Sequence, residues 1–151
     1  MKISIGADHA GFLLKERLRL KLVADGYDVT DRGTSSDLAC DYPVFAAAVG
    51  HDVARGVSDR GILVCGSGVG MSIAANKVSG IRAAVGTSEE QVRVTREHNN
   101  INILTLGARM MDGSAAERLV DAFFKTEFLG DNHARRVAQI AEIERNEHGA
   151  K

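Results

Sequence analysis

The stretch that decides the fold is residues 62–77, ILVCGSGVGMSIAANK. It runs from an apolar strand pattern, residues 62–65, through a glycine-rich turn into a predicted helix, residues 71–78. A strand, a tight turn and a helix in this order form the repeating unit of α/β proteins. Such a turn also places backbone N–H groups at a helix N-terminus, where they favour an anion. The stretch therefore predicts an α/β fold with an anion-binding turn that carries a thiol, Cys65.

The same alternation extends along the chain. Predicted strands cover residues 2–8, 27–31, 62–65, 81–85 and 103–106. Predicted helices cover residues 13–23, 43–56, 71–78, 89–98 and 114–124. This order predicts an α/β three-layer sandwich with a five-stranded, mainly parallel sheet and helices on both faces. In the common strand order 2-1-3-4-5, strands one and three are neighbours, so Asp8, His9 and Cys65 are expected to meet.

The tail after Gly130 differs from the rest. Residues 131–148 form one amphipathic pattern, with Val137, Ile140 and Ile143 on its apolar face, and no strand follows. This extra C-terminal helix either closes its own domain or packs on a partner subunit. The length of 151 residues suits a single domain over 1–151.

Composition excludes several classes of protein. Hydrophobic residues make up 44% and charged residues 26%, and the formal net charge is −1, which argues against a nucleic-acid partner bound through bulk charge. No apolar run reaches the roughly 18 residues of a membrane span, and no signal-peptide pattern precedes the first strand. We therefore expect a cytoplasmic protein without a membrane partner. Its two cysteines, Cys40 and Cys65, need no disulfide in a reducing compartment.

Chemistry-bearing residues follow the strands. Each has a simple structural interpretation: Asp8 can cap a helix, Cys65 can be a buried small hydrophobe, and His98 can be a solvated helix-end residue. Three glycines within residues 66–70 shift this balance, because each costs backbone stability and an ordinary turn seldom needs so many.

Known anion-binding motifs fit this turn poorly. Met71 stands where a dinucleotide fingerprint needs its last glycine and where a cysteine phosphatase needs an arginine, and Lys77 is too far along for a Walker loop. Proton abstraction beside a carbonyl fits better, because it needs a base at carbon and donors at the developing oxyanion. Guanidinium groups for a phosphate come from Arg109, Arg135 and Arg136.

These residues lie within a longer resemblance. The chain resembles ribose-5-phosphate isomerase type B, in a family that includes galactose-6-phosphate isomerase subunits and allose-6-phosphate isomerases. The segments that carry it are GADHAGF (6–12), DYP (41–43), CGSGVG (65–70), IAANK (73–77), GIRA (80–83), HN (98–99) and GAR (107–109). The resemblance implies a Rossmann-like sheet and an aldose–ketose isomerase of ribose 5-phosphate and ribulose 5-phosphate, without metal or cofactor. It also implies a homodimer or dimer of dimers that shares its active site at the interface, where helix 131–148 would pack.

Site residues follow from the resemblance by position. Cys65 resembles the base that moves a proton between C1 and C2, and Ser67 the hydroxyl that assists at the enediolate oxygen. His98, with Asp8, resembles the pair that opens the furanose ring. The loop glycines Gly66, Gly68 and Gly70 resemble the anion hole, Tyr42 and Asn99 resemble sugar contacts, and His9, Arg109 and Arg136 resemble phosphate ligands.

One position departs from the family pattern. The family commonly has arginine where this chain has Asn132, within GDNHARR at residues 130–136. Loss of that guanidinium leaves room for another phosphosugar, such as an allose, galactose or tetrose phosphate, or for a compensating role of Arg135. A non-catalytic sugar-phosphate sensor on the same fold is the rival from another class. The joint presence of Cys65, Ser67 and His98 favours the enzyme, since a sensor needs only phosphate ligands.

Overall fold

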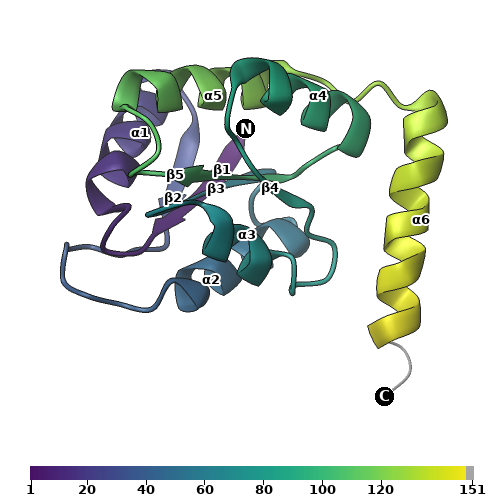
Figure 1. The fold of residues 1–151 in the computed structure, drawn as a ribbon, viewed down its shortest axis with the longest axis horizontal. Coiled ribbons are helices and arrows are strands. Elements are labelled where there is room, and N and C mark those ends of the chain that lie inside the picture. Colours follow the sequence, from purple (N-terminus) through teal and green to yellow (C-terminus); the bar gives the residue numbers. More distant parts are fainter. Residues whose placement is uncertain (149–151) are drawn as a thin grey trace.

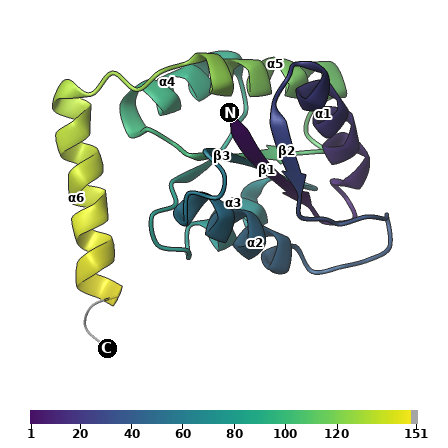
Figure 2. The same ribbon diagram turned by 180° about the vertical axis from the view of Figure 1, so that it is seen from behind.

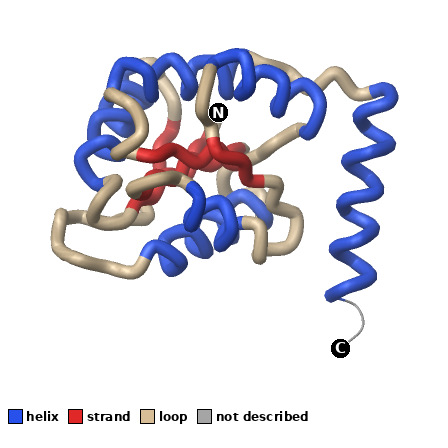
Figure 3. The backbone as a smooth tube through the Cα atoms, in the orientation of Figure 1, coloured by secondary structure: helices blue, strands red, loops and turns tan. Residues whose placement is uncertain are grey.

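In the computed structural model, which describes residues 1–148, a five-stranded parallel sheet lies between two layers of helices (Figures 1 and 3). The strands are β1 (Lys2–Ala7), β2 (Asp28–Asp31), β3 (Arg60–Cys65), β4 (Ala83–Val85) and β5 (Ile103–Gly107). The helices are α1 (Phe12–Ala24), α2 (Tyr42–Ala54), α3 (Val69–Ala75), α4 (Glu89–Asn99), α5 (Gly113–Lys125) and α6 (Asp131–His148). The predicted fold class is confirmed.

Both faces of the sheet are buried. On β3, Ile62 and Val64 pack into the core beneath α1, α4 and α5, whereas Leu63 and Cys65 pack against α2 and α3. Figure 1 shows these two sets of helices on opposite sides of the sheet. Double burial explains why the central strands read as continuous apolar runs.

The strand order is β2-β1-β3-β5-β4, so the expected order 2-1-3-4-5 is wrong for its last two strands. All residues of β5 are buried, whereas the three residues of β4 are only half-buried. A fully apolar strand buries more apolar surface in a central position of the sheet. A short strand at the edge offers fewer unpaired backbone groups to another chain. The expected neighbours β1 and β3 do pair, with Ala7 opposite Val64.

Helix α6 stands beside the β4 edge, apart from both helical layers (Figures 1 and 2). Both carboxylate oxygens of Glu144 accept the N–H of Gly80 at 3.0 Å, and the His133 ring stacks on His98 with centroids 4.0 Å apart. Ile140 and Ile143 are 46% and 64% exposed. This helix begins at the predicted residue, Asp131, and continues to the last described residue, and its packing on a partner stays a prediction.

We examined the helices of the described part of the chain for a segment that could cross a membrane. Among residues 1–148, no helix combines the length and the apolar character that a membrane crossing needs.

Candidate active site

A cavity of about 480 Å³ opens at the carboxyl ends of β1 and β3. The chain leaves β1 toward α1 on one face of the sheet and β3 toward α3 on the other. Such a switch point is where α/β proteins bind ligands. The lining residues are Asp8, Tyr42, Cys65, Gly66, Ser67, Val69, Gly70, Ile73, Arg109 and Met110. The sheet thus brings together most of the predicted site residues.

Cys65 is the last residue of β3, and its side chain is held in the turn. It is 5% exposed, and the N–H of Gly68 donates a hydrogen bond to its Sγ at 3.1 Å. The sulfur therefore has a fixed position beside the N-terminus of α3. Both cysteines of the chain are free thiols.

Two glycines of the turn have clear structural causes. Gly68 caps α3 in the left-handed conformation, at φ 79°, which side chains adopt only at a cost. A Cβ on Gly70 would lie 2.8 Å from Cζ of Tyr42, so the absent side chain makes room for the tyrosine ring. Tyr42, the first residue of α2, thereby forms a wall of the cavity.

Asp8 does not cap α1: the N-cap is Gly11, and no side chain caps this helix. Asp8 is 7% exposed, and its Oδ1 accepts the N–H of Gly11 at 3.0 Å in the turn that begins α1. It also lines the cavity beside Cys65. This hydrogen bond fixes the carboxylate, so it can act on a ligand without first being ordered.

Arg109 brings positive charge to this cavity, whereas His9, expected to meet Asp8 and Cys65, is not among the lining residues. The backbone N–H of Arg109 donates to the carbonyl of Gly66 at 3.0 Å, and its guanidinium reaches over the glycine turn. Nδ1 of His9 accepts the N–H of Cys40 at 3.3 Å. In a neutral imidazole this leaves Nε2 as the donor, so His9 can offer a hydrogen bond to an anion.

His98, Asn99 and Arg136 do not reach this cavity within one chain. Helix α4 runs antiparallel to the strands, so its last turn lies at their amino ends. The carbonyl of Asn99 accepts a bond from Arg82, directly before β4, and the carbonyl of Asn102 accepts the N–H of Gly61 near the start of β3. Cys65 lies four residues beyond Gly61, about 13 Å at the rise of a strand. The predicted residues form two separate groups in the protomer.

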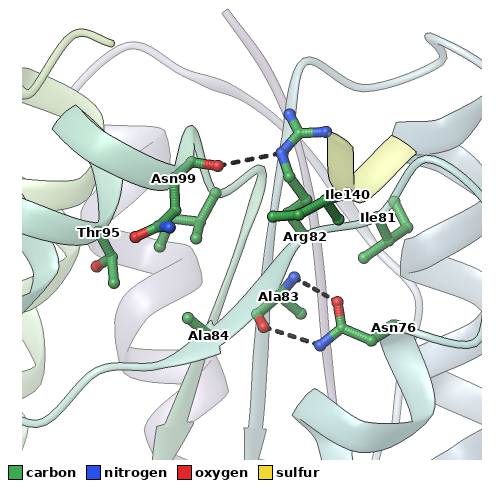
Figure 4. Close-up of a pocket in the computed structure, with 9 residues that line it drawn as sticks. Asn76, Ile81, Arg82, Ala83, Ala84, Thr95, Asn99 and Ile140 are labelled. Carbon is green, nitrogen blue, oxygen red and sulfur yellow. Dashed lines mark hydrogen bonds between the residues drawn. The ribbon is translucent and has the colours of Figure 1, made fainter. Parts of the chain in front are cut away.

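Asn99 lines a separate cavity of about 270 Å³ between β4, α4 and α6 (Figure 4), whereas His98 and Arg136 are not among its lining residues. Arg82 is its charged side chain, and Asn99 and Ile140 lie on its wall. Across it, the amide of Asn76 pairs with both the N–H and the carbonyl of Ala83, at 2.8 and 2.9 Å. This pairing occupies part of the free edge of β4.

Sequence reasoning missed the apolar wall of the first cavity. Val69 and Ile73 are 49% and 59% exposed on α3, and Met110 is 70% exposed. Val69 and Ile73 are four residues apart on α3, and this spacing was the available signal for an apolar wall. Apolar residues at helical spacing usually indicate a core face, so the signal was not used. No group of three or more His, Cys, Asp or Glu side chains within residues 1–148 is placed to hold a metal ion.

Together these features describe an α/β protein whose switch-point cavity sets a thiol, a carboxylate and a guanidinium around a glycine-rich turn. The family model of the ribose/galactose isomerases matches residues 3–140. The chain is 44% identical to ribose-5-phosphate isomerase B of Escherichia coli K12, over 95% of this chain and 96% of that protein. This chain belongs to the ribose/galactose isomerase family.

Solved structures agree with the sequence match. Ribose-5-phosphate isomerase B of Clostridium thermocellum has a TM-score of 0.96 and 49% identity, covering 97% of this chain and 99% of that one. The Mycoplasma genitalium enzyme, solved with bound ribulose 5-phosphate, has a TM-score of 0.92 and 39% identity, covering 95% and 96%.

Proposed function

We propose that this protein is an isomerase that interconverts ribose 5-phosphate and ribulose 5-phosphate through an enediolate, with Cys65 as the base. The observation that carries the proposal is the cavity that fixes the Cys65 thiol beside the N–H groups of the 66–70 turn. The family match and the ribulose 5-phosphate bound by the Mycoplasma genitalium relative support this substrate.

The proposed steps keep every proton accounted for. Cys65, as thiolate, takes the proton from C2 of the open-chain aldose, and the electron pair moves to O1 to give the enediolate. N–H groups of the turn stabilise this oxygen, and Ser67 assists the shift of the O2 proton to O1. The Cys65 thiol then protonates C1 and leaves the ketose. His98 and Asp8 open the furanose ring before these steps.

The proposal includes a homodimer, or a dimer of such dimers, with a shared site. Asn99 contacts Arg82 at the amino end of β4, whereas Cys65 lies at the carboxyl end of β3, about 13 Å beyond Gly61 by the rise of a strand, so one chain does not assemble the predicted set. A second copy related by a two-fold axis would bring the end of its α4 to the Cys65 cavity of the first copy. The first copy would bring the end of its own α4 to the Cys65 cavity of the second. The exposed Ile140 and Ile143 of α6 give this partner an apolar surface to cover.

Phosphate binding divides between the same two groups. Arg109 and His9 would meet the phosphate from the Cys65 side, and Arg136 would meet it from α6 of the second copy. Asn132 lies one turn before Arg136, where the family pattern commonly has arginine. For this reason an allose, galactose or tetrose phosphate stays the alternative substrate. The two free thiols support a reducing, cytoplasmic setting.

A substrate panel tests the proposal. The purified protein would be incubated with four-, five- and six-carbon aldose phosphates, with a chelator present in a parallel series, and the products followed by NMR. We expect fastest turnover of ribose 5-phosphate and the same rate with the chelator. Faster turnover of another chain length would reassign the substrate. Binding without turnover of any sugar would indicate a sensor.

A further inference from the structure

The turn that carries His98 and Asn99 ends in an unusual conformation. Asn100, the C-cap of α4, is left-handed at φ 48° without being glycine. The last carbonyls of a helix have no partner within it, so Asn99 and Asn100 need donors from elsewhere. Arg82 supplies donors to both carbonyls, and Arg96 binds the side chain of Asn100.

Arg82 holds the turn from the side of β4. Its Nε lies 3.2 Å from the carbonyl oxygen of Asn99 and 3.0 Å from that of Asn100, and donates to both (Figure 4 shows the first). Its own backbone is fixed by Asn102, whose Oδ1 accepts the Arg82 N–H at 2.8 Å and whose N–H donates to the Arg82 carbonyl at 3.1 Å. A cation at this place also meets the negative end of the α4 dipole.

Arg96 holds the turn from inside the core. It is 3% exposed, and its Nη1 donates to Oδ1 of Asn100 and to the carbonyl of Ile101. Its Nε donates to the carbonyl of Thr126, in the segment that leads to α6. Burial lowers the pKa of Arg96 to about 10, so the guanidinium still carries its charge at neutral pH.

We propose that Arg82 is a positioning residue for ring opening: by bridging the Asn99 and Asn100 carbonyls it fixes the His98–Asn99 turn that serves the Cys65 cavity of a second copy. The inference rests on the proposed function. Arg96 anchors Asn100 from the core, so Arg82 is the more exposed of the two contacts and the one that substitution can remove selectively. Misplacing a catalytic group by about 1 Å can cost roughly a hundredfold in rate.

Two reactions of the same enzyme separate this role from a general loss of structure. Net conversion of ribose 5-phosphate requires opening of its ring. Ribulose 5-phosphate has no hydroxyl placed to close a five-membered ring, so exchange of its C1 proton with deuterium oxide needs only the base and the anion turn. Both rates would be measured for the full-length protein, Arg82→Met and Arg82→Lys, with folding checked by circular dichroism. His98→Ala serves as the reference for lost ring opening, and Arg93→Met, on the exposed face of α4, as the control.

We expect Arg82→Met to lower net conversion roughly tenfold or more while the exchange changes less than about twofold. Arg82→Lys should show the same split at smaller size, since one ammonium keeps the charge but loses the fixed geometry of the guanidinium. If Arg82→Met does not fold, Arg82→Lys carries the comparison. Equal losses in both reactions, or no loss in either, would overturn the positioning role. A failure of His98→Ala to show the split would instead overturn ring opening by His98.

Discussion

The sulfur of Cys65 is the single atom on which the proposed chemistry depends. Its position follows from the end of β3 and from the Gly68 N–H at 3.1 Å, and serine at this place can accept the same bond. We expect Cys65→Ser to fold and bind phosphosugar but to lose roughly 10²–10⁴-fold in turnover, the usual contribution of a positioned base, because a hydroxyl is a far weaker base. Exchange of the substrate C2 proton with solvent should stop as well.

The matched control for this variant is the other cysteine. Cys40 is half-buried, and its contact with His9 is made by its backbone, so Cys40→Ser should keep full turnover. Undiminished C2 exchange in Cys65→Ser would rule out the thiol as the base and leave Asp8, the carboxylate of the same cavity, as the next candidate.

For Asn132 we predict a substitution that improves substrate binding. It is exposed on the first turn of α6, next to Arg135 and Arg136. If phosphate is bound there, Asn132→Arg should lower the KM for ribose 5-phosphate, because a charged hydrogen bond contributes about 1.5–3 kcal/mol, or roughly tenfold to a hundredfold in affinity. The affinity for unphosphorylated ribose should change much less.

The comparison variant for this position is Arg135→Ala. A sharp rise in KM there, with no gain from Asn132→Arg, would show that Arg135 already compensates. A change confined to four- or six-carbon phosphates would show that ribose 5-phosphate is not the natural substrate.

Among the elements, α1 carries a charge network that makes stability depend on pH. Hydrogen bonds from Arg19 and then Lys15 lower the pKa of Glu16 from its ordinary 4.5 to about 2. A carboxylate whose pKa is lowered by folding stabilises the native state above its unfolded pKa and loses that contribution as the pH falls through the folded one. The contribution of Glu16 is therefore present at pH 6 and fades from about 4.5 toward 2.

Substitution of Glu16 tests this linkage. Glu16→Gln should be less stable than the parent at pH 6, and the difference should shrink as the pH falls toward 2. Urea unfolding across this range measures it, with Glu142→Gln, an exposed carboxylate of α6, as the control. A destabilisation that stays constant with pH would mean that packing of the side chain, and not its charge, is what matters.

Element types were predictable from the sequence because period and turn residues determine them locally. The start of α6 at Asp131 was assigned correctly, and Pro43 marked the first turn of α2 as expected. The places of β4 and β5 were not predicted, because strand order depends on how much apolar surface each strand buries among the others. The contrast between the ILTLG run of β5 and the short AAV of β4 held that information, but the expected order was taken from the common case.

At the scale of the whole molecule, the residues around Cys65 could be placed together from the sequence. The position of His98 and Asn99 relative to them could not. Asp8, Tyr42, Cys65 and Arg109 meet because loops that follow neighbouring parallel strands share one edge of the sheet. His98 lies at the end of an antiparallel helix, and therefore at the opposite edge. A linear motif does not show whether a residue will lie at the carboxyl or the amino ends of the strands. Nor does it show whether a second copy of the chain will place that residue beside Cys65.

The separation of Cys65 and His98 within one chain leads to a prediction about mixed dimers. If each site takes Cys65 from one chain and His98 from another, Cys65→Ser and His98→Ala each convert ribose 5-phosphate slowly alone but complement each other when mixed. After dissociation and reassociation, half of the dimers are mixed, and each mixed dimer has one site with both substitutions and one with neither. Activity should therefore return to about a quarter of the parent level by the symmetry of a two-fold dimer. Sedimentation measured in parallel would confirm the dimer. Recovery that never exceeds the sum of the two variants, in a preparation shown to exchange subunits, would place the complete site within one chain and require α4 to move.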